Sequence, residues 1–546
     1  MRYFLIGSKE LSCLILDRLL EAGEEVLGVF TRDHEPGMKV WHELGHRSLA
    51  SYARKHNIPV YENINVNSNE ARKILTEANL DIILSCFWSQ MFREPTLNIP
   101  KLGIYNFHTA YLPKNRGSRP IPWALIKGES QTGITVHRMM TGVDNGPVLA
   151  QKKVAITAED TGKTLYEKVT QAGGELAKQV IAELASNAFK LTLQDEDQAT
   201  YQPRGEPYGR QINPYWSDDE KDRFRRAFDF PPFSSALDAP NPALNGKKPR
   251  LYVLLGFDCD RPRGIYAFSE EGQKVARRKF NSLNAVKEDL DQLGIDRSYF
   301  ISGQFLESMT TLFGREEMIS VFISAKCNVE LGDHTYHHDI LKPLPTRPDK
   351  IALTAQQLKK EIRLNTQTFE KILGDGIKSR GLRSPLGYFE GMKGQYKSID
   401  VMKREGMRYI STDLRDENHS LHPKLFDNSG KPRQPYRYEN GLLEIPAIGW
   451  QDTVFSGLST TPLFEEHPKS FEEIIVYFEQ LFNDAQKIVQ SNKRDFFLGL
   501  TLHPLDNSYY NENRQFFPAI KNLLQKLEGD FLTYGEVCDH YNSTYD

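Results

Sequence analysis

The strongest constraint on the fold is a rhythm of short apolar strands and amphipathic helices that stops near residue 200 and begins again near residue 250. Between these points, residues 201–250 carry eight prolines, which interrupt any long periodic element. A chain of 546 residues also exceeds what a single hydrophobic core organises. The sequence therefore predicts an α/β domain on each side of a proline-rich connector.

The first half alternates strands and helices in an order typical of a parallel sheet. Strands are expected at residues 2–7, 25–31, 81–86, 103–108, 134–138 and 148–156, and helices at residues 11–21, 48–56 and 165–186. This order predicts a Rossmann-like sheet with helices on its faces, whose chemistry gathers at the carboxyl ends of the strands. Gly7-Ser8 lacks the Gly-x-Gly-x-x-Gly fingerprint, which argues against a nicotinamide cofactor.

Polar side chains gather at the end of one of these strands. Asn106 and His108 lie two residues apart, so both side chains point the same way, and Asp144 returns from a later loop. An amide and a histidine can hold the oxyanion that forms when an amine attacks a carbonyl. A carboxylate can orient the imidazole and help to take the proton of the amine. We expect an acyl-transfer site.

This segment resembles the formyltransferases that use 10-formyltetrahydrofolate. The shared motifs are Asn-x-His at 106–108, Leu-Pro at 112–113, Arg-Gly at 116–117, Thr-Gly at 132–133 and Asp-x-Gly at 144–146. Ala110 replaces the usual serine after the histidine. The resemblance implies 10-formyltetrahydrofolate as cosubstrate, with its head held by the loop Cys86, Phe87, Trp88, Ser89, Gln90 and Met91.

The connector carries a second resemblance. Residues 226–233 are similar to a segment that follows the catalytic domain in sugar formyltransferases, which places the end of the first domain near Asp238. We expect a catalytic domain at residues 1–205, a connector at 206–248 and a second domain at 249–546.

The second half resumes the alternation of strands and helices. Strands are expected at residues 251–257, 298–303, 330–332, 408–411, 442–446 and 496–503, and helices at residues 272–293 and 354–373. This order predicts a barrel-like α/β domain.

Carboxylates and histidines follow two of these strands. Asp258 and Asp260 point the same way from a strand end, so one can bind a metal while the other acts as a base. His334 and His338 have the spacing that converges on one face of a helical turn. Oxygen and nitrogen ligands suit zinc, but also cobalt, nickel, manganese or iron. The open positions favour a catalytic metal.

These residues look like the polysaccharide deacetylase (NodB-homology) family. Its motifs occur in order as Phe-Asp-Cys-Asp at 257–260, His-Thr-Tyr-His-His at 334–338, Leu-Arg-Ser-Pro-Leu-Gly at 382–387, Glu-Ile-Pro at 444–446 and Leu-Thr-Leu-His-Pro at 500–504. Cys259 between the aspartates and the following Arg261 match an Asp-x-Asp branch. The resemblance implies a distorted (β/α) barrel with zinc as the expected metal. It implies Asp258 as general base, Asp260, His334 and His338 as ligands, Arg383 as the residue that orients the base, and His503 as general acid.

Two further histidine patterns are interpreted as structural rather than as metal ligands. His42-Glu-Leu-Gly-His46 matches the zinc-protease pattern, but Gly45 weakens the required helix and Pro36-Gly37 indicates a loop. His337 is expected to pack or face solvent.

Composition limits the partners. A net charge of −3 with interspersed signs argues against a nucleic-acid or anionic-membrane partner. Five scattered cysteines indicate neither a disulfide framework nor a thiolate zinc site, and no stretch reaches membrane-spanning length. The opening residues are too weakly apolar for a signal peptide, so a cytoplasmic enzyme is expected, with homo-oligomerisation left open.

The combined hypothesis is a bifunctional enzyme that formylates a primary amine, such as a nucleotide-linked amino sugar, and hydrolyses an N-acetyl amide. Together the two reactions would exchange one acyl group for another. Three alternatives remain: a deformylase in the second half, an aminoacyl-tRNA acceptor, or one half acting as a non-catalytic binding module.

Overall fold

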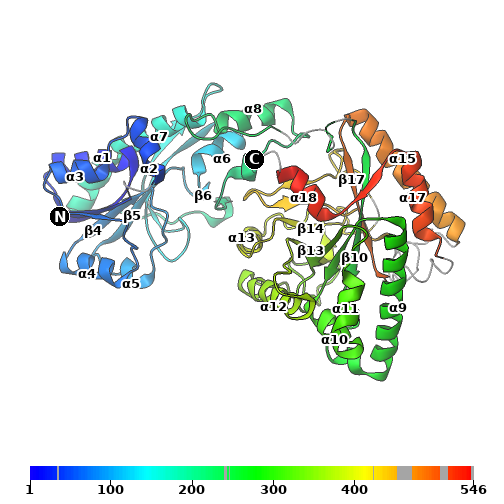
Figure 1. Cartoon of the computed structure of the whole chain (residues 1–546). Helices are drawn as coiled ribbons and strands as arrows, with labels where there is room; N and C mark the ends of the chain where they lie inside the picture. The colour runs from blue at the N-terminus through cyan, green and yellow to red at the C-terminus, as the bar shows by residue number, and fades with distance from the viewer. Residues whose placement is uncertain are drawn as a thin grey trace. The chain divides into compact units, whose positions relative to one another are not determined.

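The computed structural model describes the whole chain except residues 33–35, 188, 239–242, 245, 247, 422–423, 452–469, 505–513 and 543–546. The chain forms two compact units (Figure 1). Unit 1 comprises Met1–Ile212 and Trp216–Leu237, and unit 2 comprises Asn213–Tyr215 and Asp238–Asp546. Most of the proline-rich connector therefore packs with the first unit.

Unit 1 is built on a seven-stranded sheet with the order β3-β2-β1-β4-β5-β7-β8. Its strands are β1 (Arg2–Gly7), β2 (Glu25–Thr31), β3 (Val60–Glu62), β4 (Ile82–Cys86), β5 (Gly103–His108), β7 (Gln131–Arg138) and β8 (Val148–Ala155). The first five run parallel, whereas β7 and β8 are antiparallel to their neighbours. A separate two-stranded ladder joins β6 (Arg116–Gly117) to β9 (Tyr201–Gln202).

Helices cover both faces of this sheet. They are α1 (Lys9–Glu21), α2 (Pro36–Glu43), α3 (Leu49–Lys55), α4 (Asn69–Glu77), α5 (Glu94–Leu97), α6 (Pro120–Ile126), α7 (Gly162–Ser186) and α8 (Asp218–Ala227). Figure 1 shows α1, α3 and α7 on one face and α4 and α5 on the other. Along β1, Tyr3 and Leu5 pack in one core, and Phe4 and Ile6 pack in the other. Burial on both faces is the condition in which parallel strands occur, and the expected parallel-rich α/β sheet is confirmed.

The segment after β2 differs from the expectation. The predicted loop at Pro36-Gly37 is wrong, because α2 begins at Pro36, where proline is well tolerated in the first turn. This helix ends at Glu43, and Gly45 has a positive φ of 87°. His42 Nδ1 faces the backbone carbonyl of His46 at 3.2 Å, and the His46 ring packs edge-on against Trp41. The two histidines therefore do not share one helical face, as the zinc-protease pattern requires.

Unit 2 contains a nine-stranded sheet with the order β15-β16-β14-β13-β12-β11-β10-β17, and β18 also pairs with β10. The strands are β10 (Leu251–Cys259), β11 (Arg297–Ile301), β12 (Val329–Asp333), β13 (Gly381–Tyr388), β14 (Tyr409–Asp413), β15 (Tyr436–Arg437), β16 (Leu443–Glu444), β17 (Phe496–Leu502) and β18 (Asp530–Leu532). All pairs are parallel except β15 with β16.

The helices of unit 2 include two long ones that the sequence predicts, α9 (Glu270–Leu293) and α12 (Ala355–Leu373). The others are α10 (Gly303–Phe313), α11 (Arg315–Phe322), α13 (Tyr396–Arg404), α15 (Phe471–Asn492), α17 (Phe516–Lys526) and α18 (Tyr534–Asn542). Within the described ranges the two edges of the sheet, β15 and β17, do not pair with each other. The domain thus has the parallel strands that a barrel requires, but in the described residues they form an open sheet.

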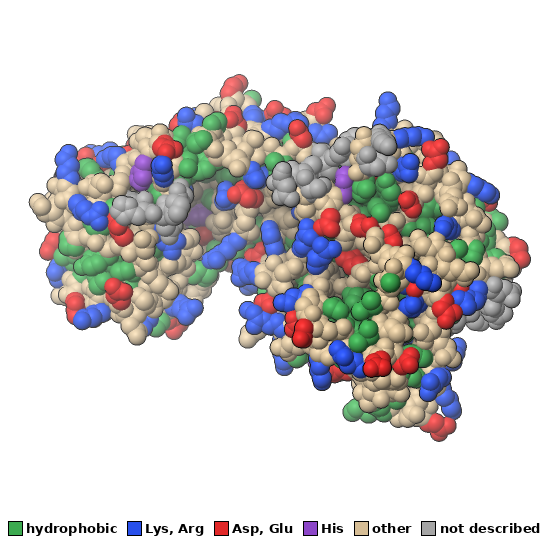
Figure 2. All heavy atoms as spheres, in the orientation of Figure 1, with side chains coloured by type: hydrophobic (Ala, Val, Ile, Leu, Met, Phe, Trp, Pro, Cys, Tyr) green, Lys and Arg blue, Asp and Glu red, His purple; other side chains and the backbone are tan. Residues whose placement is uncertain are grey.

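Surface and covalent features add little constraint. Figure 2 shows acidic and basic side chains interspersed on the visible face of each unit. All five cysteines are free. In the described part of the chain, no helix combines the length and the apolar character that a membrane span requires.

A buried glutamate joins the edge strands of the second sheet. Glu444 of β16 accepts hydrogen bonds from the backbone N–H groups of Thr412 and Asp413 at 2.6 and 2.8 Å. It also accepts from Thr412 Oγ1 at 2.8 Å and from the Tyr438 hydroxyl at 2.6 Å. Burial, with a smaller effect of the Asp413 charge, raises the pKa of Glu444 to about 7.

This raised pKa predicts that the stability of unit 2 depends on pH. Between about pH 4.5 and pH 7 the unfolded chain loses the proton of Glu444 while the folded chain keeps it. This group's contribution to the free energy of unfolding is therefore full below pH 4.5 and falls as the pH rises towards 7, by up to about 3 kcal/mol. Glu444→Gln should remove this part of the pH dependence. Urea unfolding of the wild type and of Glu444→Gln at pH 5 and pH 7 gives the change in the free energy of unfolding between these pH values. An equal change in both proteins would contradict the prediction.

Candidate functional site

The first site lies where β5 meets β7. Asn106 and His108 lie on one side of β5, and Asn106 is paired with His137 across the antiparallel ladder. The Asn106 Nδ2 atom lies 3.4 Å from His137 Nε2. This pairing brings an amide and two imidazoles to one end of the sheet.

Asp144 connects the two histidines. Its Oδ2 atom lies 3.5 Å from His108 Nδ1, and its Oδ1 atom lies 3.3 Å from His137 Nε2. The backbone N–H of Gly117 donates to Oδ2 at 2.9 Å. Burial alone would raise the pKa of Asp144, but the charge of His108 and the hydrogen bonds from His137 and Gly117 hold it well below its usual range. The group is therefore a carboxylate at neutral pH.

Backbone contacts hold the loop and the ring in place. The Gln194 amide donates to the carbonyls of Asp144 and Gly146 at 2.8 and 2.7 Å. A side chain at Gly146 would place its Cβ 1.7 Å from the Arg138 carbonyl oxygen, so the Asp-x-Gly turn requires glycine. His108 Nε2 lies 2.9 Å from the carbonyl oxygen of Asn115.

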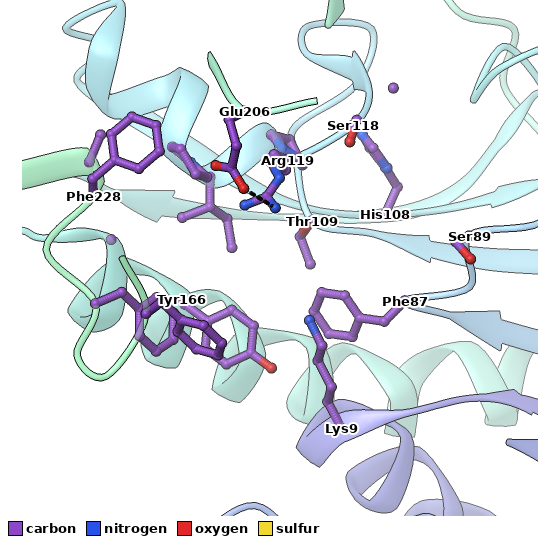
Figure 3. Close-up of a pocket in the computed structure, with 18 of the residues that line it drawn as sticks. Lys9, Phe87, Ser89, His108, Thr109, Ser118, Arg119, Tyr166, Glu206 and Phe228 are labelled. Atoms are coloured by element: carbon purple, nitrogen blue, oxygen red, sulfur yellow. Dashed lines mark ion pairs between the residues drawn. The ribbon is translucent and has the colours of Figure 1, made fainter. Parts of the chain in front are cut away.

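Asn106, His108 and Asp144 line a cavity of about 720 Å³ (Figure 3). Three residues of the expected folate loop, Phe87, Trp88 and Ser89, form part of its wall. The other three do not line it. Cys86 is buried with its Sγ 3.0 Å from Ser12 Oγ, Gln90 accepts from Val66 N at 2.9 Å, and Met91 is exposed.

The proline-rich connector supplies the opposite wall of the cavity. The lining includes Glu206, Arg210, Phe228, Phe230 and Phe233. Figure 3 shows the ion pair of 2.6 Å between Glu206 and Arg119. The connector is therefore part of the cavity wall, whereas the resemblance at 226–233 had indicated only that the first domain extends to about Asp238.

Sequence reasoning assigned no role to two residues of this site, His137 and Lys9. His137 ends the Thr-Gly-Ile-Thr-Val-His run, and its position opposite Asn106 became visible only with the strand register. Lys9 lies in the cavity with its Nζ 3.9 Å from the centroid of the Trp41 ring.

The second group of residues lies at the carboxyl ends of β10 and β12 in unit 2. Asp260 Oδ2 lies 3.3 Å from His338 Nε2, and Asp258 Oδ2 lies 3.9 Å from His334 Nε2. The centroids of the two imidazole rings are 4.8 Å apart. The structure brings all four side chains together.

The predicted helical turn at residues 334–338 is wrong. The segment is a loop in which Thr335 and His338 have φ values of 59° and 62°. The Asp333 side chain accepts from Thr335 N at 2.6 Å, and Glu361 of α12 accepts from His337 N at 2.8 Å. These contacts replace the backbone hydrogen bonds of a helix, and the histidines converge through the loop instead.

Arg383 of β13 lies beneath this group. Its Nη1 lies 3.1 Å from Asp258 Oδ1, and its backbone carbonyl lies 2.9 Å from His334 Nδ1. The guanidinium packs 4.2 Å from the centroid of the Phe300 ring. A Cβ at Gly256 would lie 2.4 Å from Nη1, so glycine leaves the path for the guanidinium. Arg383 therefore fixes one carboxylate and one imidazole at once.

The side chains suit a divalent ion. Donation from His334 Nδ1 to the Arg383 carbonyl leaves Nε2 with its lone pair, as a ligand requires. Burial lowers the pKa of His334 and of His338, which favours the neutral form of each ring. Arg263 donates to Asp260 Oδ2 at 3.3 Å and faces His338 Nδ1 at 3.4 Å.

His503 follows β17 directly, and its ring packs edge-on against Trp450 with centroids 5.4 Å apart. Burial alone would raise the pKa of Asp260, but the positive charges of His338, His503 and Lys279 hold it well below its usual range. His503 thus lies within electrostatic reach of Asp260.

A neighbouring cluster involves His337, Asp339 and Glu361, whose ligand-type atoms lie within 4.8 Å of one another. Glu361 is already engaged, because its two oxygens accept from His337 N at 2.8 Å and contact His337 Nδ1 at 2.7 Å. We interpret Glu361 as the residue that holds the histidine loop, a role that no sequence motif indicated.

Comparison with known proteins concerns the first unit. Residues 1–181 match the family model described as formyl transferase. The chain is 33% identical over 204 residues to the methionyl-tRNA formyltransferase of Kosmotoga olearia and 31% identical over 206 residues to that of Thermotoga maritima. The first alignment covers 37% of this chain and 65% of the relative, and the second covers 37% and 64%. The chain thus spans just under two thirds of these curated relatives.

Two solved structures are also similar. WlaRD, a sugar 3N-formyl transferase solved with dTDP and 5-N-formyl-THF, has a TM-score of 0.37 at 21% identity, covering 43% of this chain and 82% of its own. The N-formyltransferase of Helicobacter canadensis, solved with folinic acid and dTDP-3-aminofucose, has a TM-score of 0.36 at 23% identity, covering 42% and 80%. Residues 1–181 are thus the part of this chain that is similar to formyl transferases.

Proposed function

We propose that this chain is a bifunctional enzyme. Unit 1 transfers a formyl group from 10-formyltetrahydrofolate to a primary amine, and unit 2 hydrolyses an N-acyl amide with a divalent metal. The observation that carries the first activity is the Asn106, His108 and Asp144 cluster in the wall of a cavity within a formyl transferase domain. The second activity is supported by the arrangement of its own residues.

In unit 1 the residues divide the work of amide formation. Asn106 donates a hydrogen bond to the oxyanion that develops as the amine nitrogen bonds to the formyl carbon, and His108 donates a second one once its Nε2 turns from the Asn115 carbonyl to the oxyanion. The bond from that carbon to the folate nitrogen then breaks, and one proton passes from the amine to the leaving nitrogen. Asp144 is a weak base because its pKa is so low, so its role is to orient His108 and stabilise positive charge on the ring. Phe87, Trp88 and Ser89 hold the folate head.

In unit 2 the residues support hydrolysis of an amide. A divalent ion, with zinc as the first candidate, would be held by Asp260, His334 and His338 and would supply Lewis acidity towards the acyl oxygen and water. Asp258, fixed by Arg383, takes the proton of the attacking water. His503 gives a proton to the departing nitrogen.

The two activities make sense together as acyl exchange. Removal of an acetyl group exposes an amine, and the formyl transferase then formylates it, with a nucleotide-linked amino sugar as the proposed substrate. Incubation of amino and acetamido sugar nucleotides with the protein, a divalent metal and formyl donor tests both steps by mass spectrometry. Release of acetate supports deacetylation, and release of formate supports the alternative of a deformylase.

An aminoacyl-tRNA is the second candidate acceptor, favoured by the identity to methionyl-tRNA formyltransferases. The net charge of −3 argues against it, because tRNA binding draws on an excess of basic residues. Filter binding of tRNA at low salt separates the two acceptors, since a sugar enzyme should retain no tRNA.

Asp144→Asn should lower the rate of formyl transfer by about 100-fold or more, because the amide carries no charge to stabilise a protonated His108. Binding of 5-formyltetrahydrofolate, measured by calorimetry, should change little. Asp218→Asn, at a fully exposed position of α8, is the matched control and should keep the full rate. An Asp144→Asn protein with undiminished turnover would rule out the proposed role.

The second site predicts two variants with different defects. His338→Ala should lose both ion binding and amide hydrolysis, because it removes a ligand. His503→Ala should bind zinc or cobalt normally but hydrolyse amides at least about 100-fold more slowly, because it removes only the general acid. Calorimetric titration with the metal alone separates the two effects. Equal loss of ion binding in both variants would contradict the assignment of His503.

Glu361→Gln should weaken metal binding about tenfold, because the loop that carries His334 and His338 loses an acceptor for His337 N–H or for its ring. The control is Glu370→Gln on the same helix, whose side chain is partly exposed and pairs with Lys378. Calorimetry with cobalt at equal protein concentrations gives both affinities. If the two variants match the wild type, Glu361 has no positioning role.

A further inference from the structure

Arg383 is buried beneath the second site with only part of its hydrogen-bonding capacity used. Its side chain is 1% exposed. Nη1 donates to Asp258 Oδ1 at 3.1 Å and to the backbone carbonyl of Gly256 at 3.3 Å. Nε and Nη2 are also buried, and neither has a hydrogen-bond partner among the residues that the structure describes. Because a buried donor without an acceptor is costly, another interaction is needed to stabilise the guanidinium.

Two aromatic rings supply this interaction. The guanidinium carbon lies 4.2 Å from the centroid of the Phe300 ring and 4.8 Å from the centroid of the Tyr534 ring. The two rings meet edge to face, with centroids 5.4 Å apart, and both are fully buried. A cation over the face of an aromatic ring is attracted by the ring, and more strongly where water is excluded. The rings therefore form a corner that holds the guanidinium.

Tyr534 is itself held at the start of α18 by a set of contacts around Glu330 of β12. Glu330 Oε2 accepts from the backbone N–H of Gly535 at 2.7 Å and from Ser298 Oγ at 2.9 Å. The backbone N–H of Tyr534 donates to the same Ser298 Oγ at 3.1 Å. The Tyr534 ring lies nearly parallel to that of Tyr409, with centroids 6.2 Å apart and an interplanar angle of 18°. These contacts give the Tyr534 ring one fixed place beside Arg383.

The position of the guanidinium matters because the side chain and the backbone of Arg383 support different groups. The guanidinium orients Asp258, the proposed base, whereas the backbone carbonyl lies 2.9 Å from His334 Nδ1. The ladder between β13 and β14, in which Arg383 lies opposite Ser411, keeps that carbonyl in place. Loss of the Tyr534 ring would therefore release the guanidinium and Asp258 but leave His334 where it is.

We propose that Tyr534 is a positioning residue of unit 2, whose ring holds the Arg383 guanidinium and through it keeps Asp258 in the orientation that proton transfer requires. The effect on rate rests on the proposed amide hydrolysis. The inference adds α18, which no sequence motif indicated, to the elements that build the second site.

NMR of the full-length protein labelled with nitrogen-15 arginine tests the contact without any turnover. Aromatic faces shift the Nε–H proton of a guanidinium upfield, and the Arg383 signal is assigned by its loss in Arg383→Lys. Tyr534→Leu, and Tyr534→Met as a second variant that fills more of the space, should move this signal towards those of exposed arginines. Tyr534→Phe, which keeps the ring, should leave it upfield. The matched control is Tyr541→Leu, a buried aromatic of the same helix whose ring packs against Phe497 with centroids 6.1 Å apart.

Hydrolysis kinetics separate positioning from a general loss of packing. Tyr534→Leu should lower kcat about 10–100-fold, with KM and the calorimetric affinity for zinc alone within about threefold of the wild type. Tyr534→Phe should restore kcat, and Tyr541→Leu should keep it. An unmoved Arg383 signal in Tyr534→Leu and Tyr534→Met, or an equal loss of kcat in Tyr541→Leu, would overturn the proposal. A wild type that hydrolyses no amide would refute the proposed hydrolysis, and the NMR signal would then decide alone whether Tyr534 holds Arg383.

Discussion

Both candidate sites depend on one geometric constraint, the shared direction of neighbouring parallel strands. Because β4 and β5 end at the same edge, residues 87–89 and the Asn106-x-His108 pair line one cavity. In unit 2 the parallel register of β10, β11 and β12 brings the aspartates of one strand end to the histidines of another. The polar side chains of the candidate sites lie at these strand ends because the middle of each strand carries apolar side chains that are buried on both faces of the sheet.

At these edges, buried carboxylates are stable only where donors surround them. Asp144 has two imidazoles and a backbone N–H, and Asp258 has the Arg383 guanidinium. The result is a low pKa at Asp144 and a fixed orientation of the neighbouring ring. Glu444 shows the opposite balance, because burial and a second carboxylate outweigh its four donors and the pKa rises. A buried carboxyl group is therefore a permanent negative charge at Asp144, whereas at Glu444 it connects neighbouring strands and changes its protonation state with pH.

Local pattern was enough to predict most of the strands that carry these residues, but it missed β13 with Arg383, and it failed where tertiary contacts decide the backbone. Short apolar segments between amphipathic stretches predicted β1, β2 and β5 with the bounds observed. The spacing of His334 and His338 suggested a helix, but side-chain acceptors from Asp333 and Glu361 hold a loop with two left-handed residues. Glu361 lies 23 residues beyond His338 in the sequence. The amphipathic pattern of α12 indicates which face of the helix is buried, but not which residue outside the helix Glu361 contacts. His137 and Lys9 depend likewise on strand register and on the shape of the cavity.

The proposed acyl exchange would set a strict demand on specificity, because a hydrolase that accepted formamides would undo the proposed formyl transfer. An acetyl group differs from a formyl group by one methyl, and a pocket for one methyl discriminates by only about 10–200-fold. A steady supply of free amine therefore requires that the acetylated substrate outcompete the formylated product at the second site.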